Sequence, residues 1–205
     1  ASDTCKIVSF DVFDTLIVRP FSKPSDIFSL MAEEFNRIIN SESIADFGYM
    51  RQYAEKHARE ILKEEGKEEV SLADIYEVFG KDFNVSEKIC KHMLDFEIDT
   101  EMDFCVAQKS GYDLYKFAKY FEREIIIVSD MYLSQQVIEK ILKKNNYFDY
   151  DRIYVSSEYN KCKHDKKLYE LIANDLGLKG ENLKTLVHIG DNYSSDFKAA
   201  KEFGF

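Results

Sequence analysis

Residues 7–16 read IVSFDVFDTL, and this stretch decides which fold the chain can adopt. The apolar run 7–10 ends abruptly in the carboxylate of Asp11, and a second carboxylate and a hydroxyl follow at Asp14 and Thr15. Strands of parallel α/β sheets end in this way where their carboxyl edges form ligand sites. An aspartate at such a place serves as a nucleophile, as a metal ligand or as both. Taken alone, the stretch is equally compatible with a strand followed by an Asp-Thr turn.

The composition is that of a folded acidic protein. Of the 205 residues, 45% are hydrophobic and 14% are aromatic, which is enough for a sizeable core. The formal net charge of -10 disfavours binding to nucleic acid and to anionic membranes, since both are negatively charged. No apolar run approaches the roughly 20 residues of a membrane span. We therefore expect no nucleic-acid partner and no membrane partner, whereas a small phosphorylated molecule stays compatible with the composition.

The cysteines indicate reduced thiols. They lie at Cys5, Cys90, Cys105 and Cys162, without a C-x-x-C pair or a zinc-ligand spacing. The polar amino end, residues 1–6, leads directly into a strand and is not typical of a signal peptide. Together these features predict a cytoplasmic location.

Strand and helix patterns alternate over much of the chain. Short apolar runs with polar ends predict four buried strands, and amphipathic helical spacing follows the last three of them. Strands that alternate with helices imply an α/β fold with a Rossmann-like parallel sheet and helices on both faces. The predicted strands are 7–10, 125–128, 152–155 and 185–189, and the helices that follow are 135–145, 167–176 and 194–205.

Between the first two strands the pattern is entirely helical. We expect no strand from residue 20 to residue 110, so this block is an insertion beside the carboxyl edge of the sheet. The predicted domains are therefore an α/β core, 1–19 with 111–205, and a helical insertion, 20–110. The helices expected between the first two strands are 27–38, 44–65, one from Ser71, 86–96 and 111–120.

Each predicted strand is followed by polar residues with useful chemistry. In a parallel sheet these strand ends share one edge, so a carboxylate, a hydroxyl, an ammonium and an acidic pair should gather there. Such a set suits a phosphoryl group held against Mg²⁺, because carboxylate oxygens bind the ion while Ser and Lys bind phosphate oxygens. The residues concerned are Asp11, Ser129, Asp130, Lys161, Lys163, Asp191 and Asp196.

The order of these motifs resembles that of the haloacid dehalogenase (HAD) superfamily over nearly the whole chain. The matching elements are DVFDTL at 11–16, Ser129, KHD at 163–165, and the pair Gly190-Asp191 followed by Asp196. The chain is most similar to predicted hydrolases with DVFDTL in the first motif, some of which are fused to glycosyltransferases. The resemblance implies a Rossmann-like core with a helical cap inserted after the first strand. Because the sheets of that superfamily usually continue with another strand, it also leaves room for a longer protein with such a fused domain.

The resemblance implies a role for each matching residue. Asp11 resembles the nucleophile that forms an aspartyl intermediate, and Ser129 resembles the hydroxyl that binds phosphate. Lys163 resembles the lysine that neutralises the charges of the nucleophile and of the phosphoryl group. Asp191 and Asp196 resemble the acidic pair that holds Mg²⁺.

Further contacts are implied around these groups. The metal would also touch Asp11 and the backbone carbonyl of Phe13, and Thr15 and Asp130 would join Ser129 and Lys163 in binding the substrate. The expected function is thus a Mg²⁺-dependent phosphatase for a small phosphorylated metabolite, with an aspartyl-phosphate at Asp11.

Phe13 departs from the pattern, because phosphatases of the superfamily carry a second, acid–base aspartate at this position. A phenyl ring transfers no protons, and general acid–base help is typically worth about a hundred- to ten-thousandfold in rate. Asp14 is a neighbouring carboxylate. Two alternatives therefore stay open: a phosphate-binding or regulatory module with weak turnover, and a 2-haloacid dehalogenase. The candidates for a halide-binding arginine in the second alternative are Arg19, Arg37 and Arg51.

Some residues have a structural interpretation beside the functional one. Lys161 competes with Lys163, which the register of Asp165 favours. Asp130 is expected to shape its loop through bonds to the backbone, and His188 is expected to be a packed core histidine.

Four residues of the helical insertion carry the same ambiguity. Glu97 and Glu101 have helical spacing, for which a solvent-facing surface is the more usual explanation, although they could face the site. Phe28 and Phe47 are either core residues or part of a substrate pocket.

Overall fold

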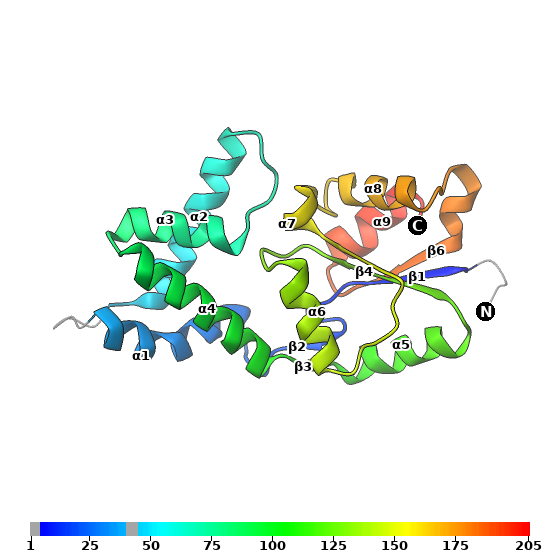
Figure 1. Ribbon diagram of the computed structural model, residues 1–205. Coiled ribbons are helices and arrows are strands. Elements are labelled where there is room, and N and C mark those ends of the chain that lie inside the picture. The colour runs from blue at the N-terminus through cyan, green and yellow to red at the C-terminus, as the bar shows by residue number, and fades with distance from the viewer. Residues whose placement is uncertain (1–4, 40–44) are drawn as a thin grey trace. The chain divides into compact units, whose positions relative to one another are not determined.

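The computed structural model describes residues 5–39 and 45–205 and divides the chain into two units (Figure 1). The first unit comprises Ala1–Val18 and Val106–Phe205, and the second comprises Arg19–Cys105. The boundaries predicted from the sequence lay after residues 19 and 110. The later boundary differs because a short strand, β3 (Val106–Ala107), pairs with β2 (Ile17–Val18) and so belongs to the first unit.

The first unit is built on a parallel four-stranded sheet. Its strands are β1 (Ile7–Phe10), β4 (Glu124–Ser129), β5 (Arg152–Val155) and β6 (Leu186–Ile189), in the order β5-β4-β1-β6. All three strand pairs are parallel, which confirms the four predicted strands and the fold class. Because β1 lies between β4 and β6, the residue that follows it, Asp11, stands at the middle of the carboxyl edge.

The strands are apolar because both faces of the sheet are covered. Helices α5 (Lys109–Tyr120) and α6 (Gln135–Lys144) lie on one side of the strands, and α8 (Lys167–Asp175) and α9 (Ala200–Phe203) lie on the other (Figure 1). On the α5 side, Phe10 contacts Tyr115 with ring centroids 5.9 Å apart. On the α8 side, Ile126 and Val128 share one buried cluster with residues of α8 and α9.

A glycine allows α5 to pack against the turn that follows Asp11. A Cβ atom at Gly111 would lie 2.0 Å from the carbonyl oxygen of Thr15, so no other residue fits without movement of the backbone. The close packing holds the first motif against a rigid helix. The predicted helix 111–120 starts slightly earlier in the structure, at Lys109.

The second unit contains four α-helices in its described part. They are α1 (Ile27–Ile39), α2 (Phe47–Glu64), α3 (Leu72–Phe83) and α4 (Glu87–Phe104), with a 3₁₀ turn at Pro24–Asp26. Ser71 caps α3 as predicted, with its side chain accepting the Asp74 amide. Residue 44, the predicted start of the second helix, lies outside the described residues. The prediction that 20–110 contains no strand is wrong, because two-residue strands such as β3 are too short to produce an alternating pattern.

Phenylalanine rings form the core of the second unit. Phe28, Phe35, Phe47 and Phe79 pack with ring centroids 5.0 to 6.4 Å apart. Phe28 and Phe47 are both buried in this cluster. Their core interpretation is therefore the correct one.

Two carboxylates of α4 are buried, so the solvent-facing interpretation of Glu97 and Glu101 is wrong. Arg51 donates to Glu97 at 2.7 and 2.8 Å, and both side chains are fully buried. Arg19 donates to Glu101 at 2.7 and 2.9 Å. A buried charge is tolerated when it is paired and hydrogen-bonded in this way. Helical spacing alone does not reveal that each glutamate has an arginine partner elsewhere in the sequence.

No helix in the described ranges, 5–39 and 45–205, is both long and apolar enough to cross a bilayer.

Candidate active site

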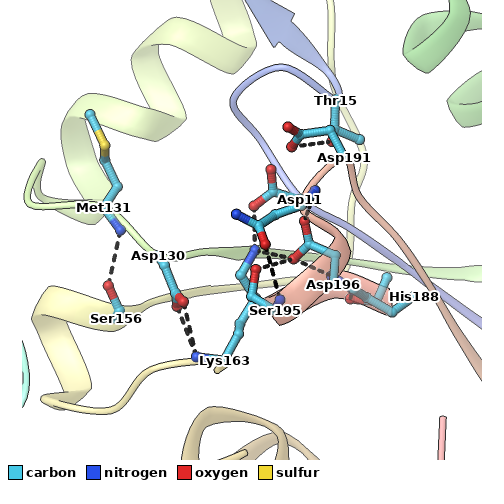
Figure 2. A network of polar contacts seen from close by, with 12 residues as sticks. Asp11, Thr15, Asp130, Met131, Ser156, Lys163, His188, Asp191, Ser195 and Asp196 are labelled. Atoms are coloured by element: carbon cyan, nitrogen blue, oxygen red, sulfur yellow. Dashed lines mark hydrogen bonds and ion pairs between the residues drawn. The ribbon is translucent and has the colours of Figure 1, made fainter. Parts of the chain in front are cut away.

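Three adjacent strands bring the predicted site residues to one edge of the sheet (Figure 2). Asp11 follows β1, Ser129 is the last residue of β4, and Gly190 and Asp191 follow β6. The Asp11 amide donates to the carbonyl of Ile189 at 2.9 Å, which ties the two strand ends together. The parallel topology therefore produces the gathering that the sequence predicted.

The residues after Asp11 form a compact turn. The amides of Leu16 and Ile17 both donate to the carbonyl of Val12 at 2.8 Å, and Asp14 adopts the left-handed conformation with φ of 60°. This turn places the Thr15 hydroxyl 3.4 Å from Asp191, to which it donates. The residues after Asp11 thus form a turn, as the Asp-Thr turn interpretation expected. This turn faces the acidic cluster.

Asp196 lies on a π-helical segment, Tyr193–Ala199, that begins after the capping residue Asn192. The Asn192 amide donates to Oδ2 of Asp196 at 3.0 Å. Gly190 makes room for this carboxylate, because a Cβ atom at position 190 would lie 2.3 Å from it. The wider π turn is frequent at functional sites, and here it directs Asp196 back toward the sheet edge.

Lys163 links two of the carboxylates. Its Nζ lies 2.5 Å from Oδ1 of Asp11 and 2.7 Å from Oδ1 of Asp196, and the residue is 2% exposed. The structure places Lys163 at the acidic cluster. Lys161 was the alternative candidate for this position. Both carboxylate oxygens of Asp130 accept the Lys163 backbone amide, at 3.0 and 3.1 Å. Asp130 thus shapes this loop, and its contact with a substrate stays a prediction.

The environment sets the charge of each group. Burial raises the pKa of Asp11 to about 6, although Lys163 opposes this and Asp196 adds to it. Burial also favours the neutral form of Asp196, but the hydrogen bond from His188 and the charge of Lys163 outweigh it and hold the pKa of Asp196 below its ordinary value. The two carboxylates raise the pKa of Lys163 despite its burial, so the lysine is a fixed cation.

The acidic cluster fits a divalent cation. Asp11, Asp191 and Asp196 each offer a carboxylate oxygen, and these atoms lie within 4.8 Å of one another. Figure 2 shows the three side chains directed toward a common region. Three carboxylates face one ammonium, which leaves two negative charges uncompensated when all are ionised. Hard oxygen donors with uncompensated charge are what Mg²⁺ requires. The contact between the Phe13 backbone carbonyl and the metal stays a prediction.

The remaining candidates fall into two groups. Ser129 is buried at the end of β4, and its phosphate-binding role stays a prediction. The three arginines considered for halide binding form ion pairs within the second unit: Arg19 with Glu101, Arg51 with Glu97, and Arg37 with Glu34.

The side chain of His188 is buried, as expected for a core histidine. Its Nε2 lies 3.2 Å from Asp196 and its Nδ1 lies 2.8 Å from the hydroxyl of Ser9. Burial lowers the pKa of His188 although Asp196 favours the protonated ring. The sequence did not point to Ser9, because a single serine within the apolar run 7–10 gives no sign of a polar partner on β6.

No protein-family model and no curated protein matches the sequence. Solved structures do share its fold. A 2-haloacid dehalogenase from Pseudomonas syringae pv. tomato matches with a TM-score of 0.68 and 11% identity, over 98% of this chain and 84% of that chain. A protein from Thermotoga maritima named as a β-phosphoglucomutase matches with a TM-score of 0.61 and 14% identity, over 98% and 82%. A magnesium-bound protein from Bacillus subtilis named as a HAD-hydrolase matches with a TM-score of 0.62 and 15% identity, over 98% and 86%.

These comparisons show the HAD fold, which the order of the sequence motifs had implied. At such low identity the likeness concerns the fold alone. The names of the matching proteins include a dehalogenase and a phosphoglucomutase, so the fold supports more than one reaction. The reaction must therefore be argued from the side chains at the sheet edge.

Proposed function

We propose that this chain is a Mg²⁺-dependent hydrolase that removes the phosphoryl group of a small phosphorylated metabolite through an aspartyl-phosphate at Asp11. One observation carries the proposal: the Lys163 ammonium lies 2.5 Å from Asp11 and 2.7 Å from Asp196 within a cluster of three carboxylates. A nucleophilic carboxylate beside a fixed cation and an acidic metal site is suited to attack on a phosphate ester.

The first step transfers the phosphoryl group to the protein. Lys163 holds Oδ1 of Asp11, and the other carboxylate oxygen attacks phosphorus. The new bond joins that oxygen to phosphorus, and the bond from phosphorus to the ester oxygen breaks with its electron pair on the departing oxygen. The alcohol leaves as its oxyanion, or takes a proton from water, because Phe13 has none to give.

The second step restores the carboxylate. Water attacks phosphorus, the bond to Asp11 breaks, and inorganic phosphate leaves. One proton of the water stays with phosphate and the other passes to solvent. During both steps Ser129 and Lys163 would bind phosphate oxygens that do not react, and Thr15 would hold Asp191 in place.

Asp11, Asp191 and Asp196, with the Phe13 carbonyl, would hold the magnesium ion. When bound, Mg²⁺ supplies positive charge that lowers the repulsion between the anionic substrate and the carboxylates. Several expectations stay predictions. They are a cytoplasmic location, a small phosphorylated substrate, the lack of nucleic-acid and membrane partners, and a fused domain such as a glycosyltransferase.

Phosphate release from a panel of sugar phosphates and nucleotides, with Mg²⁺ present, tests the proposal. Asp11→Asn should abolish release because the amide is not a nucleophile. Asp113→Asn makes the same change on the half-exposed surface of α5 and should leave release intact. Equal release from wild type and Asp11→Asn, or none from either, contradicts the proposal. Halide release from 2-haloacids by the same proteins would assign carbon–halogen cleavage instead.

Phe13 favours a second candidate, a phosphate-binding module with slow turnover. The same cluster would bind a phosphorylated molecule, but no acid at position 13 would help its leaving group depart. Calorimetry with a sugar phosphate separates the two candidates. Tight binding without phosphate release supports the module, particularly if Phe13→Asp creates activity.

A further inference from the structure

His188 occupies a position where a strand would normally carry an apolar side chain. It lies in the middle of β6, its side chain is 1% exposed, and its strand neighbour Leu186 on the same face belongs to the buried cluster. An imidazole buried in this way costs free energy unless its nitrogens are hydrogen-bonded. Both nitrogens have partners: Ser9 on β1 and Asp196 on the π-helical segment.

The partners determine which nitrogen carries the proton. Nε2 faces the Asp196 carboxylate at 3.2 Å, and a carboxylate only accepts hydrogen bonds, so Nε2 must be the donor. Nδ1 is then the acceptor in a neutral ring, and the Ser9 hydroxyl donates to it at 2.8 Å. The Asp196 carboxylate thus selects the tautomer, and the Ser9 hydroxyl, which can donate as well as accept, satisfies the other ring nitrogen.

Tyr169 fixes the plane of the ring from the α8 side. Its ring meets that of His188 edge to face, with centroids 5.4 Å apart. Its hydroxyl donates to the backbone carbonyl of Ser195 at 2.9 Å, next to Asp196 in the sequence. The imidazole and the segment that carries Asp196 are therefore anchored to the same tyrosine.

In the part of the chain that the structure describes, the other contacts of the Asp196 carboxylate come from outside the strands. Lys163 lies beyond β5 and is shared with Asp11, and Asn192 and Ser195 belong to the same turn as Asp196. His188 is a sheet residue, paired in register with Ser9, two residues before Asp11. The contacts Ser9–His188–Asp196 therefore connect the strand of the nucleophile to the carboxylate that faces it.

We infer that His188, anchored through its other ring nitrogen to Ser9, is a positioning residue that fixes the Asp196 carboxylate for Lys163 and for the cation. The inference rests on the proposed function in so far as it assigns a purpose to Asp196. The contact itself is independent of turnover.

Three variants test the inference. His188→Leu removes the donor and keeps an apolar side chain in the strand. His188→Gln keeps an amide N–H that can reach Asp196. Leu186→Val perturbs the packing of the same face of β6 without touching the hydrogen bonds. The primary readout is Mg²⁺ affinity by calorimetry in the absence of substrate, with thermal unfolding to report folding.

We expect His188→Leu to bind Mg²⁺ about tenfold more weakly or worse, as is typical when a metal ligand loses its hydrogen-bonded support. His188→Gln should recover much of that affinity. Leu186→Val should unfold at a lower temperature and bind Mg²⁺ as wild type does. Unchanged affinity in a folded His188→Leu, or equal losses in the Leu and Gln variants, would overturn the inference.

Nitrogen NMR of the imidazole gives a second readout. In wild type we expect Nε2 to be protonated and Nδ1 to be the acceptor, and Ser9→Ala should keep this tautomer because the Asp196 carboxylate sets it. A wild-type ring protonated at Nδ1 would overturn the inference. If wild type neither binds Mg²⁺ nor releases phosphate, the proposed function fails, and the NMR signature then decides the His188 contact alone.

Discussion

At the scale of single residues, chemistry is concentrated around Asp11. The carboxylate is buried, bound to Lys163 and surrounded by Asp191 and Asp196. Such strongly perturbed groups in one cluster are typical of functional sites. The same neighbourhood contains Phe13, which supplies no proton. If Asp11 is the nucleophile, as proposed, the lack of a companion acid makes specific demands on the leaving group and on pH.

The first demand concerns the leaving group. Because Phe13 cannot protonate the departing oxygen, phosphate release should slow steeply as the leaving group becomes more basic across a series of aryl and alkyl phosphates. Phe13→Asp should make this dependence shallower and speed alkyl phosphates by about 10² to 10⁴. Phe13→Leu is the matched control and should keep the steep dependence. A shallow dependence in wild type would show that another group acts as the acid.

The second demand concerns pH. The pKa of Asp11 is raised to about 6, so its carboxylate is protonated and unreactive below that pH. Activity at limiting Mg²⁺ should therefore fall as pH drops through about 6. Mg²⁺ competes with the proton for the same oxygens, so higher Mg²⁺ concentrations should move the acidic limb of the rate profile to lower pH. If the acidic limb did not shift with the Mg²⁺ concentration, its assignment to Asp11 would be contradicted.

At the scale of elements, the positions of the four strands of the parallel sheet followed from the sequence, whereas the short strands β2 and β3 and the contacts between distant residues did not. Four apolar runs located β1, β4, β5 and β6, because buried parallel strands have a strong local signature. The pairing of Ser9 with His188 left no such signature, since it depends on strand order. The same holds for Glu97 and Glu101. Their burial depends on arginines that the local pattern does not reveal.

Gly111 tests the contact between α5 and the turn after Asp11. Replacing a helical glycine by alanine normally stabilises a protein by up to about 1 kcal/mol. Here the new Cβ would lie 2.0 Å from the Thr15 carbonyl oxygen, and overpacking of this kind costs roughly 1–3 kcal/mol or more. Gly111→Ala should therefore lower the free energy of unfolding in chemical denaturation and reduce activity.

Gly48→Ala is the matched control, because a Cβ there meets its nearest atom at 3.5 Å, an ordinary contact. It should leave stability unchanged or slightly higher. If both alanine variants had the same stability, the close packing of α5 on the Thr15 turn would not be real.

At the scale of the whole molecule, the two units have separate cores. All the predicted catalytic, phosphate-binding and metal-binding residues belong to the parallel-sheet unit. The helical unit has its own aromatic cluster and buried ion pairs. The division into an α/β part and a helical insertion was predictable because the hydrophobic period changes between them. The identity of the substrate was not, because it depends on side-chain geometry that no local pattern encodes.

The proposed reaction requires that Asp11 carries the phosphoryl group during turnover. Acid quenching during turnover, followed by peptide mass spectrometry, tests it most directly. We expect one phosphoryl group on the peptide that contains residues 7–16, at Asp11, lost again when the substrate is exhausted, and absent in Asp11→Asn. A phosphoryl group on another residue, or undiminished turnover by Asp11→Asn, would contradict it.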